Sequence, residues 1–404
     1  MDYTMGSFWS ETAIRKARPS LEGDITTDVL IVGGGICGIL TAQHGFIYAD
    51  QIKRFGIEKA CMYYEANTKA IQRYRKLAKQ FPCDFEDTTA YVYTTNNRRQ
   101  LECEATAYGA LGISTRIQEN PPLPFKTVGA LAMEGQAQFH LLKLLYALAD
   151  ELDVYENTFV SKIKGQTAIT SRGIIKANHI MLATHYPLIN IPGLYFMKLY
   201  QHRSYVIALK NAPIPGGMYV DHQENGHSFR SYGNLLFIGG GDHKTGKKGG
   251  GYAEIRALAK QAYPHAAEKY HWATQDCMTL DKVPYIGQLR AGSENLYVAT
   301  GFNKWGMTGA MVAAELLTDL VVSGQSKLAE LYCPQRPMAS RQLFINIGAA
   351  AKGLLSIGKP RCAHMGCKLH WNAGEKSWDC ACHGSRFDKE GHVINNPAKK
   401  GIRL

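Results

Sequence analysis

The sequence predicts an α/β protein with a small separate module at its C-terminal end. Three observations support this fold class. An apolar strand near the N-terminus runs into a glycine-rich turn, a second strand meets another glycine-bearing turn near residue 300, and four cysteines and three histidines fall within the 23 residues from Cys362 to Gly384. The first two features are typical of a nucleotide-binding sheet and the third of a metal site.

The composition is that of an ordinary globular protein and narrows the class of partner. The chain has 404 residues, enough for two or three domains, and a net charge of +12. Its basic residues are scattered rather than clustered with aromatics, so nucleic acid is not an expected partner. Without a signal peptide or a run of roughly 18 apolar residues, the chain is predicted to be cytoplasmic and to have no transmembrane segment.

The first glycine turn lies in "TTDVLIVGGGICGILTA". A strand from Val29 to Val32 leads into a G-x-G-x-x-G pattern formed by Gly33, Gly35 and Gly38, and the residues that follow favour a helix. In a Rossmann-like domain these glycines permit a tight turn, close approach of the backbone to a pyrophosphate and close helix packing. The pattern predicts a dinucleotide site, with a purely structural turn as the alternative.

The acidic residue that should follow this motif is missing. A dinucleotide-binding domain places an Asp or Glu at the end of its second strand, about 20 residues on, to bind the ribose hydroxyls. Glu58 has a suitable distance, but it begins a segment whose apolar residues recur at helical spacing up to Pro82. We therefore interpret Glu58 as a solvated helix residue.

The middle of the chain alternates between segments of the nucleotide-binding domain and strand-rich blocks. An amphipathic helix in "QAQFHLLKLLYALADEL" and a buried strand in "IIKANHIMLATHYP" separate two strand-rich blocks. This order predicts an antiparallel-sheet substrate domain interleaved with the nucleotide-binding domain. The expected nucleotide-binding parts are about 27–80, 135–195 and 275–335, and the expected substrate-sheet parts are about 84–134 and 196–274.

The second glycine turn lies in "NLYVATGFNKWGMTGAMVAAELL". A strand ends near Ala299, Gly301 begins the turn, and a helix follows whose N-terminal amides lie around Gly306, Met307 and Thr308. A helix N-terminus stabilises negative charge, so this segment is a candidate for a second contact with the same cofactor.

The C-terminal stretch contains Cys362-x-His364 and, fifteen residues later, Cys380-x-x-His383. This arrangement resembles the ligand spacing of Rieske proteins, in which two cysteines hold one iron of a [2Fe-2S] cluster and two histidines hold the other. The alternative is structural zinc. Zinc fingers, however, usually pair cysteine with cysteine and histidine with histidine, whereas here each segment supplies one of each.

Together with "MTLDKVPYIG", the two glycine turns resemble the FAD-dependent amine and amino-acid oxidoreductases of the D-amino-acid oxidase and glycine oxidase type, over most of residues 27–335. The whole chain resembles bacterial members with a C-terminal Rieske domain, which gives expected boundaries of 1–344 and 345–404. The resemblance implies FAD and a [2Fe-2S] cluster as cofactors, a disulfide between Cys367 and Cys382, and Ser385 as a hydrogen-bond donor to the cluster.

The resemblance also implies a function. An amine or amino acid would be oxidised by hydride transfer to FAD, and electrons would pass singly to the cluster and then to a protein or quinone acceptor. His202, Arg203, Tyr205 and Lys304 are candidates for the substrate pocket, with Arg203 suited to a carboxylate. For each of the four, an ordinary role in the fold is the alternative.

Two departures from the family pattern keep other functions open. A block of some tens of residues after "GILTA" is missing, including the second strand and its acid, and the Rieske part is short enough that we expect its supporting sheet to be largely absent. An electron-transfer protein with an impaired or absent flavin site is therefore the second hypothesis, and a zinc-stabilised binding module the third.

Overall fold

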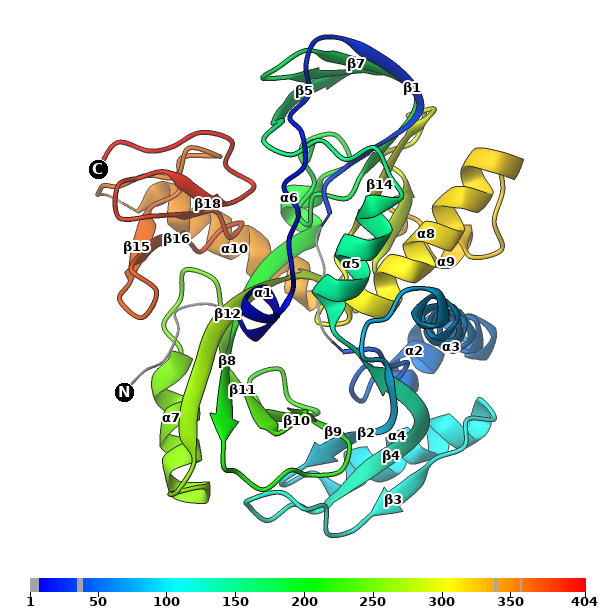
Figure 1. Cartoon of the computed structure of the whole chain (residues 1–404), viewed down its shortest axis with the longest axis vertical. Coiled ribbons are helices and arrows are strands. Elements are labelled where there is room, and N and C mark those ends of the chain that lie inside the picture. The colour runs from blue at the N-terminus through cyan, green and yellow to red at the C-terminus, as the bar shows by residue number, and fades with distance from the viewer. Residues whose placement is uncertain (1–6, 35–38, 338–339, 357) are drawn as a thin grey trace.

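The computed structural model describes residues 7–34, 39–337, 340–356 and 358–404. Its strands form three sheets, of six, eight and four strands. The four-stranded sheet lies in the C-terminal module, to one side of the other two (Figure 1). The arrangement agrees with the predicted fold class.

The six-stranded sheet is the predicted nucleotide-binding sheet. Strand β7 alternates buried and exposed residues, with Ile175, Ile180 and Leu182 in the core. One edge of β7 pairs in parallel with β1, and the other edge pairs in parallel with β14. The strands of this sheet are β1 (Ile25–Val32), β5 (Val160–Lys164), β6 (Thr167–Thr170), β7 (Ile174–Leu182), β13 (Tyr285–Gln288) and β14 (Leu296–Thr300).

Strand β1 is an edge strand of this sheet. It pairs with β7 alone among the described strands. Two of its large apolar side chains are exposed, Val29 by 38% and Ile31 by 60% of their surface. The second backbone edge of β1 is therefore unpaired in the described part of the chain, at the place where the expected second strand would lie.

The expected helix after Gly38 does not form. Residues 39–47 are irregular, and the next helix begins at Tyr48. This segment is instead tied to β4: Leu40 accepts a hydrogen bond from the amide of Ala137, and the amide of Ala42 donates to the side chain of Gln136 at 2.8 Å. Because these backbone groups bond to residues of β4, they cannot form the hydrogen bonds of a helix.

The eight-stranded sheet is the predicted substrate domain, and helix α7 (Gly251–Ala262) packs against its strands β8 and β11. Strands β8 and β12 form a long antiparallel pair in which Asp276 lies opposite His202. In spatial order the strands are β12 (Ala267–Thr279), β8 (Leu199–Lys210), β11 (Leu235–Lys244), β10 (Ser228–Tyr232), β9 (Met218–Asp221), β2 (Glu86–Thr94), β4 (Gly129–Gln138) and β3 (Arg116–Gln118).

Helix α8 (Gly306–Ser323) is the one described helix that is long and apolar enough to suit a membrane span. It packs against α3 and strand β13, and its side chains Val312 and Leu316 are fully buried, as in the core helix of a globular domain. The other helices are α1 (Phe8–Thr12), α2 (Tyr48–Phe55), α3 (Ile57–Gln80), α4 (Arg98–Ala110), α5 (Leu141–Asp150), α6 (Tyr195–Lys198), α9 (Ala329–Tyr332) and α10 (Arg341–Leu355).

The C-terminal module has its own antiparallel sheet, contrary to the expectation that this sheet is largely absent. Its strands are short, which explains why the sequence pattern does not reveal them: a strand of two to four residues is too brief for a clear alternation. The strands are β15 (Leu369–Asn372), β16 (Ser377–Cys380), β17 (Arg386–Phe387) and β18 (Val393–Asn395).

Candidate functional site

The two predicted ligand segments form two loops of the same design beside this sheet. In the first loop the amide of Cys362 donates to the carbonyl of Cys367, and Gly366 donates back to Cys362. In the second loop the amide of Cys380 donates to the carbonyl of Ser385 and Gly384 donates back to Cys380. Both glycines have positive φ, 76° and 82°, so each turn requires a residue without a side chain.

The four predicted ligands come together between these loops. The thiols of Cys362 and Cys380 are buried and hydrogen-bonded to each other, and this contact lowers the pKa of Cys362 to about 6. The rings of His364 and His383 lie with their centroids 4.9 Å apart. The Nδ1 atoms of both rings are buried without a hydrogen-bond partner among the described residues.

Unpartnered buried nitrogen atoms are costly, and a metal is one partner that would satisfy them. Burial lowers the pKa of His364 to about 4 and that of His383 to about 3, so both rings are neutral at pH 7, as metal ligation requires. The donor set of two thiols and two Nδ1 atoms therefore fits the two irons of a Rieske cluster.

The implied disulfide is present, joining Cys367 to Cys382 across the two loops. It fixes the first loop to the second. The hydroxyl of Ser385 bonds to the thiol of Cys362, as expected, and also accepts from the amide of Ala398 at 3.0 Å. A hydrogen bond to a ligand sulfur influences the properties of the metal that the sulfur binds.

The histidines of the loops face the larger domain. His364 Nε2 lies 3.3 Å from the side-chain oxygen of Asn190, and the ring of His383 bonds to the carbonyl of Phe196. The side chain of Gln201 donates to the backbone carbonyl of His383 at 2.8 Å. The cluster loops are thus docked directly on the larger domain.

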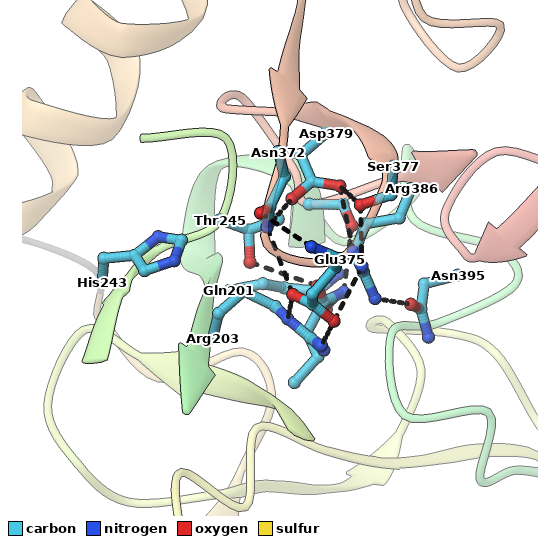
Figure 2. Close-up of polar contacts among 12 residues, drawn as sticks. Gln201, Arg203, His243, Thr245, Asn372, Glu375, Ser377, Asp379, Arg386 and Asn395 are labelled. Carbon is cyan, nitrogen blue, oxygen red and sulfur yellow. Dashed lines mark hydrogen bonds and ion pairs between the residues drawn. The ribbon is translucent and has the colours of Figure 1, made fainter. Parts of the chain in front are cut away.

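A buried ionic network holds the docked module (Figure 2). Glu375, in the turn between β15 and β16, lies between Arg203 of β8 and Arg386 of β17. Arg203 contacts both carboxylate oxygens of Glu375 and is only 3% exposed. Arg386 also donates to Asp379 at 3.0 Å.

This network changes the interpretation of Arg203 as a ligand for a substrate carboxylate. The carboxylate that it binds is Glu375 of the same chain, which sequence analysis could not pair with it because the two residues are 172 positions apart. Tyr205 is also engaged: its hydroxyl donates to Glu375 at 3.1 Å and lies 3.0 Å from His243. Both predicted residues therefore contact the C-terminal module.

Lys304 forms a second, partly buried ion pair. Its ammonium group contacts the carboxylate of Asp242 and donates to the carbonyl of Glu224 at 2.8 Å. Burial opposes the charge, but the carboxylates of Asp242 and Asp276 outweigh it, so the pKa of Lys304 is raised. Burial raises the pKa of Asp276 to about 6, which makes it a titratable group near neutral pH that sequence analysis missed.

These groups surround one cavity of about 850 Å³ between the larger domain and the C-terminal module. Its walls include Arg203, Tyr205 and Lys304 from one side and Glu375 and Arg386 from the other. His202 is not among the lining residues; it is mostly buried, and burial lowers its pKa to about 3.

Of the predicted cofactor glycines, Gly35 and Gly38 lie outside the described residues. Gly33 abuts the end of β7: a Cβ placed on it would come within 2.4 Å of the carbonyl oxygen of Ala183. Gly301 has a φ of 69° at the second turn, and Gly306 lines the cavity at the start of α8.

Met307 and Thr308 do not line the cavity, since both are buried behind it. The carbonyl of Met307 accepts a hydrogen bond from Tyr74, and the hydroxyl of Thr308 lies 3.1 Å from His44. The ring of His44 is also stacked on Trp305, with the centroids 4.8 Å apart. These contacts fix the N-terminus of α8 in place.

Comparison with known proteins identifies the two parts. A family model described as FAD dependent oxidoreductase matches residues 44–320, more than half of the chain. The chain belongs to this FAD-dependent oxidoreductase family. A model of the Rieske [2Fe-2S] domain matches residues 324–404. Together the two matches imply FAD and a Rieske-type [2Fe-2S] cluster as cofactors. Iron, not zinc, is the metal of such a domain.

Two relatives by sequence support the same organisation. A protein of Bacillus subtilis (strain 168) described as a Rieske 2Fe-2S iron-sulfur protein, YhfW, is 31% identical over 98% of this chain and 97% of its own length. That alignment extends over 492 positions, more than the 404 residues of this chain, so the relative has segments that this chain lacks. An iron-sulfur subunit of the cytochrome b6-f complex from Nostoc is 46% identical over 43 residues, 11% of this chain and 24% of that subunit.

Solved structures show the same fold. Glycine oxidase from Geobacillus kaustophilus superposes with a TM-score of 0.61 at 19% identity, over 78% of this chain and all of that chain. L-proline dehydrogenase from P. horikoshii gives 0.60 at 16% identity, over 79% and 98%.

The residues present fit one part of FAD better than the other. The cavity reaches the second glycine turn, since Gly306 at the start of α8 and Ala183, directly after β7, line it. At the adenosine end, the described residues contain no strand between β1 and α2, so they lack the strand that would end in the ribose-binding acid.

Sequence analysis missed the residues that join the two domains, namely Asn190, Gln201 and Glu375. Each is an ordinary polar residue without a motif, and its role depends on a partner more than 170 positions away. Asp276 did offer a signal, because it stands two residues before the quoted "MTLDKVPYIG".

Proposed function

We propose that this chain oxidises an amine or amino acid and passes the electrons, one at a time, from its flavin to its Rieske cluster. When bound, FAD would accept a hydride from the substrate, and the cluster would accept single electrons. Proteins of the same fold include those titled glycine oxidase, L-proline dehydrogenase and L-amino acid deaminase, which supports a C–N substrate. A protein or quinone is the proposed final acceptor.

The observation that carries this proposal is the docking of the cluster loops. His364 and His383 face the oxidoreductase domain through Asn190 and Phe196, and one cavity is lined by both domains. A short, buried route between two redox groups favours internal electron transfer over release of the electrons to solution. The cluster histidines would lie on that route.

Among the predicted substrate residues, we propose Lys304 and Tyr205 as cavity groups that orient the substrate or hold a proton, with His202 behind them. Lys304 is charged, since its pKa is raised, and it is held by Asp242 at the cavity wall. Arg203 is left out of the proposed substrate contacts because Glu375 occupies its guanidinium group.

The proposal is tested by anaerobic reduction with a panel of amines and amino acids. The flavin absorption band and the cluster's electron paramagnetic resonance signal are followed together, in the protein and in its Cys362→Ser variant. We expect the effective substrate to bleach the flavin in both proteins and to produce the cluster signal only in the first. Flavin reduction that leaves an intact cluster oxidised would refute the proposed electron path.

A second candidate function rests on the exposed edge of β1. The backbone edge of β1 that faces away from β7 has no partner among the described strands, and the family's second strand would pair there. If FAD does not bind without that strand, the chain is an electron carrier with a cluster alone. Flavin content after purification and after incubation with FAD distinguishes the two: flavin bound at one equivalent per chain supports the enzyme, and a loaded cluster without flavin supports the carrier.

A further inference from the structure

Helix α10 has the reverse of the usual distribution of apolar and polar residues. A helix on the surface of a globular protein normally buries its apolar face and exposes its polar face. In α10 the well-buried residue is Asn346, which donates to the carbonyl of Met197 at 3.2 Å and lies 3.5 Å from the ammonium group of Lys244. The side of the helix that faces the protein therefore has a polar residue at its centre, with Leu343 and Gly353 partly buried beside it.

The opposite side of α10 is apolar and open. Phe344 is 73% exposed and Leu355 is 81% exposed, and Ile345, Ile347 and Leu354 are each exposed by more than 40%. Small residues, Gly348 and Ala351, continue the exposed face between them. Scattered single apolar residues on a surface need no explanation, but a row of five along one helix marks an interaction site.

The charged residues in the sequence of α10 and its flanking segments are all of one sign. Between Gln335 and Glu375 the sequence has no acidic residue, and its basic residues are Arg336, Arg341, Lys352, Lys359, Arg361 and Lys368. Lys352 is exposed in the last turn of α10, and Lys359, four residues past the end of the helix, is exposed as well. An amphipathic helix with large apolar residues and a basic rim is typical of one that lies in the surface of a membrane containing anionic lipid.

The helix is firmly attached to the cluster module, so its orientation is fixed. A Cβ placed on Gly353 would come within 2.5 Å of the sulfur of Cys382, which shows that the helix backbone lies directly on the disulfide. The amide of Lys368 donates to the carbonyl of Gly353 at 3.1 Å. Arg361 donates to the carbonyls of Ser356 and Gly366 at 2.8 and 2.7 Å, tying the end of the helix to the first cluster loop.

We propose that the exposed face of α10, formed by Phe344, Ile345, Ile347, Leu354 and Leu355, docks the protein on the surface of an anionic membrane. With 15 residues, about 22 Å, the helix is too short to span a bilayer but long enough to lie in its interface. Docking would hold the cluster module at the membrane surface. The inference does not depend on the proposed oxidation of an amine.

Two other occupants fit the observations less well. A second copy of the chain would bring Lys352 and Lys359 of one helix towards the same like-charged region of the other. A soluble electron-transfer partner would form a small, transient and mostly polar contact, which does not need five large apolar residues. A lipid surface with negative head groups satisfies both the apolar row and the basic rim.

The test is flotation of the full-length, cofactor-loaded protein with vesicles of phosphatidylcholine alone and of phosphatidylcholine mixed with phosphatidylglycerol. We expect binding to the mixed vesicles and little to the neutral ones. The Phe344→Glu/Leu355→Glu pair should weaken binding by at least about tenfold, since membrane affinity follows the buried apolar area. Lys352→Gln and Lys359→Gln should each weaken it by about fivefold.

The matched control is Ile14→Glu/Val322→Glu, which makes the same chemical change at two other exposed apolar residues, 90% and 80% exposed. This pair should leave vesicle binding unchanged. The proposal is overturned if the unaltered protein does not float with the mixed vesicles, or if the α10 pair and the control pair bind equally. It is also overturned if the protein sediments as a dimer that the α10 pair dissociates, because the face would then be a contact between copies.

Discussion

Arg203 and Glu375 form a buried ion pair that joins the eight-stranded sheet to the C-terminal module. The guanidinium group contacts both carboxylate oxygens, and the side chains are only 3% and 12% exposed. Arg386 shares the same carboxylate at 3.0 Å. The pair fixes the position of the cluster relative to the cavity, since Glu375 lies in the turn that leads into the second ligand strand.

Replacing Glu375 by Gln should therefore loosen the contact between the domains. Two buried guanidinium groups would lose their shared carboxylate, a change that costs roughly 3–5 kcal/mol. Urea unfolding measures the loss. The control is Glu315→Gln, which breaks the more exposed pair with Arg73 and should cost less than about 1 kcal/mol. Equal losses in the two variants would show that the Glu375 pair has no special role in docking.

Cys362 should be essential for iron binding in the C-terminal module but not for flavin binding in the larger domain. Its thiol is in contact with Cys380 at the centre of the ligand set, so Cys362→Ser should abolish bound iron while leaving the flavin content unchanged. Iron and flavin analysis of the purified variant measures both. Cys61→Ser, a change at a partly exposed cysteine on α3, is the control and should retain its iron. Full iron content in the Cys362 variant would contradict the ligand assignment.

The disulfide between Cys367 and Cys382 should stabilise the cluster module. It closes a loop with a sequence separation of 15, for which chain entropy predicts a contribution of about 3 kcal/mol. The double variant Cys367→Ser/Cys382→Ser should lose iron faster in the presence of a chelator and unfold at lower urea concentration. Cys103→Ser, at an exposed free cysteine, should change neither quantity. Unchanged iron release in the double variant would contradict this role.

His44 should make the stability of the protein sensitive to acid. Burial lowers its pKa to about 3, below its usual 6.5, because the charged ring would lose its contact with water, and a hydrogen bond to the backbone carbonyl of Thr41 offsets only part of this effect. The ring also lies 2.7 Å from the hydroxyl of Tyr63 and stacks on Trp305. As the pH falls below 6.5, the ring is protonated in the unfolded chain before it is protonated in the folded protein. The contribution of neutral His44 to the free energy of unfolding is therefore complete above pH 6.5 and is lost as the pH falls toward 3. The slope is roughly 1.4 kcal/mol per pH unit.

His44→Gln should therefore be less stable at pH 7 but lose stability more slowly on acidification. Urea unfolding at a series of pH values between 7 and about 4 measures the difference. His392, which is exposed, is the control position: His392→Gln should follow the unaltered protein throughout. Parallel curves for the His44 variant and the unaltered protein would show that His44 is not held neutral.

Local patterns in the sequence predicted the parts of the site that are local in the chain. Each cluster loop carries its cysteine, its histidine and its turn glycine within five residues, so spacing alone indicated Cys362, His364, Cys380 and His383. The family resemblance supplied the disulfide. Strand β14 and helix α8 were likewise predicted, because apolar strand, glycine turn and helix follow one another directly.

Contacts between distant segments were beyond the reach of those patterns. Arg203 is suited to a carboxylate, as predicted, but the sequence does not show that Glu375 supplies it. The helix expected after Gly38 does not form, because the segment bonds to β4 instead. Helix propensity depends on the local sequence and does not include contacts with a distant strand. The sheet of the C-terminal module was underestimated because its strands are too short to show a period.

The presence of both a flavin and a Rieske cluster is tested most directly by the electron paramagnetic resonance spectrum of the anaerobically purified, dithionite-reduced protein, with the optical spectrum recorded before reduction. We expect a flavin absorption band together with a Rieske-type signal, whose average g value lies below that of clusters with four cysteine ligands. Stoichiometric zinc with neither iron nor flavin would contradict the assignment of both cofactors.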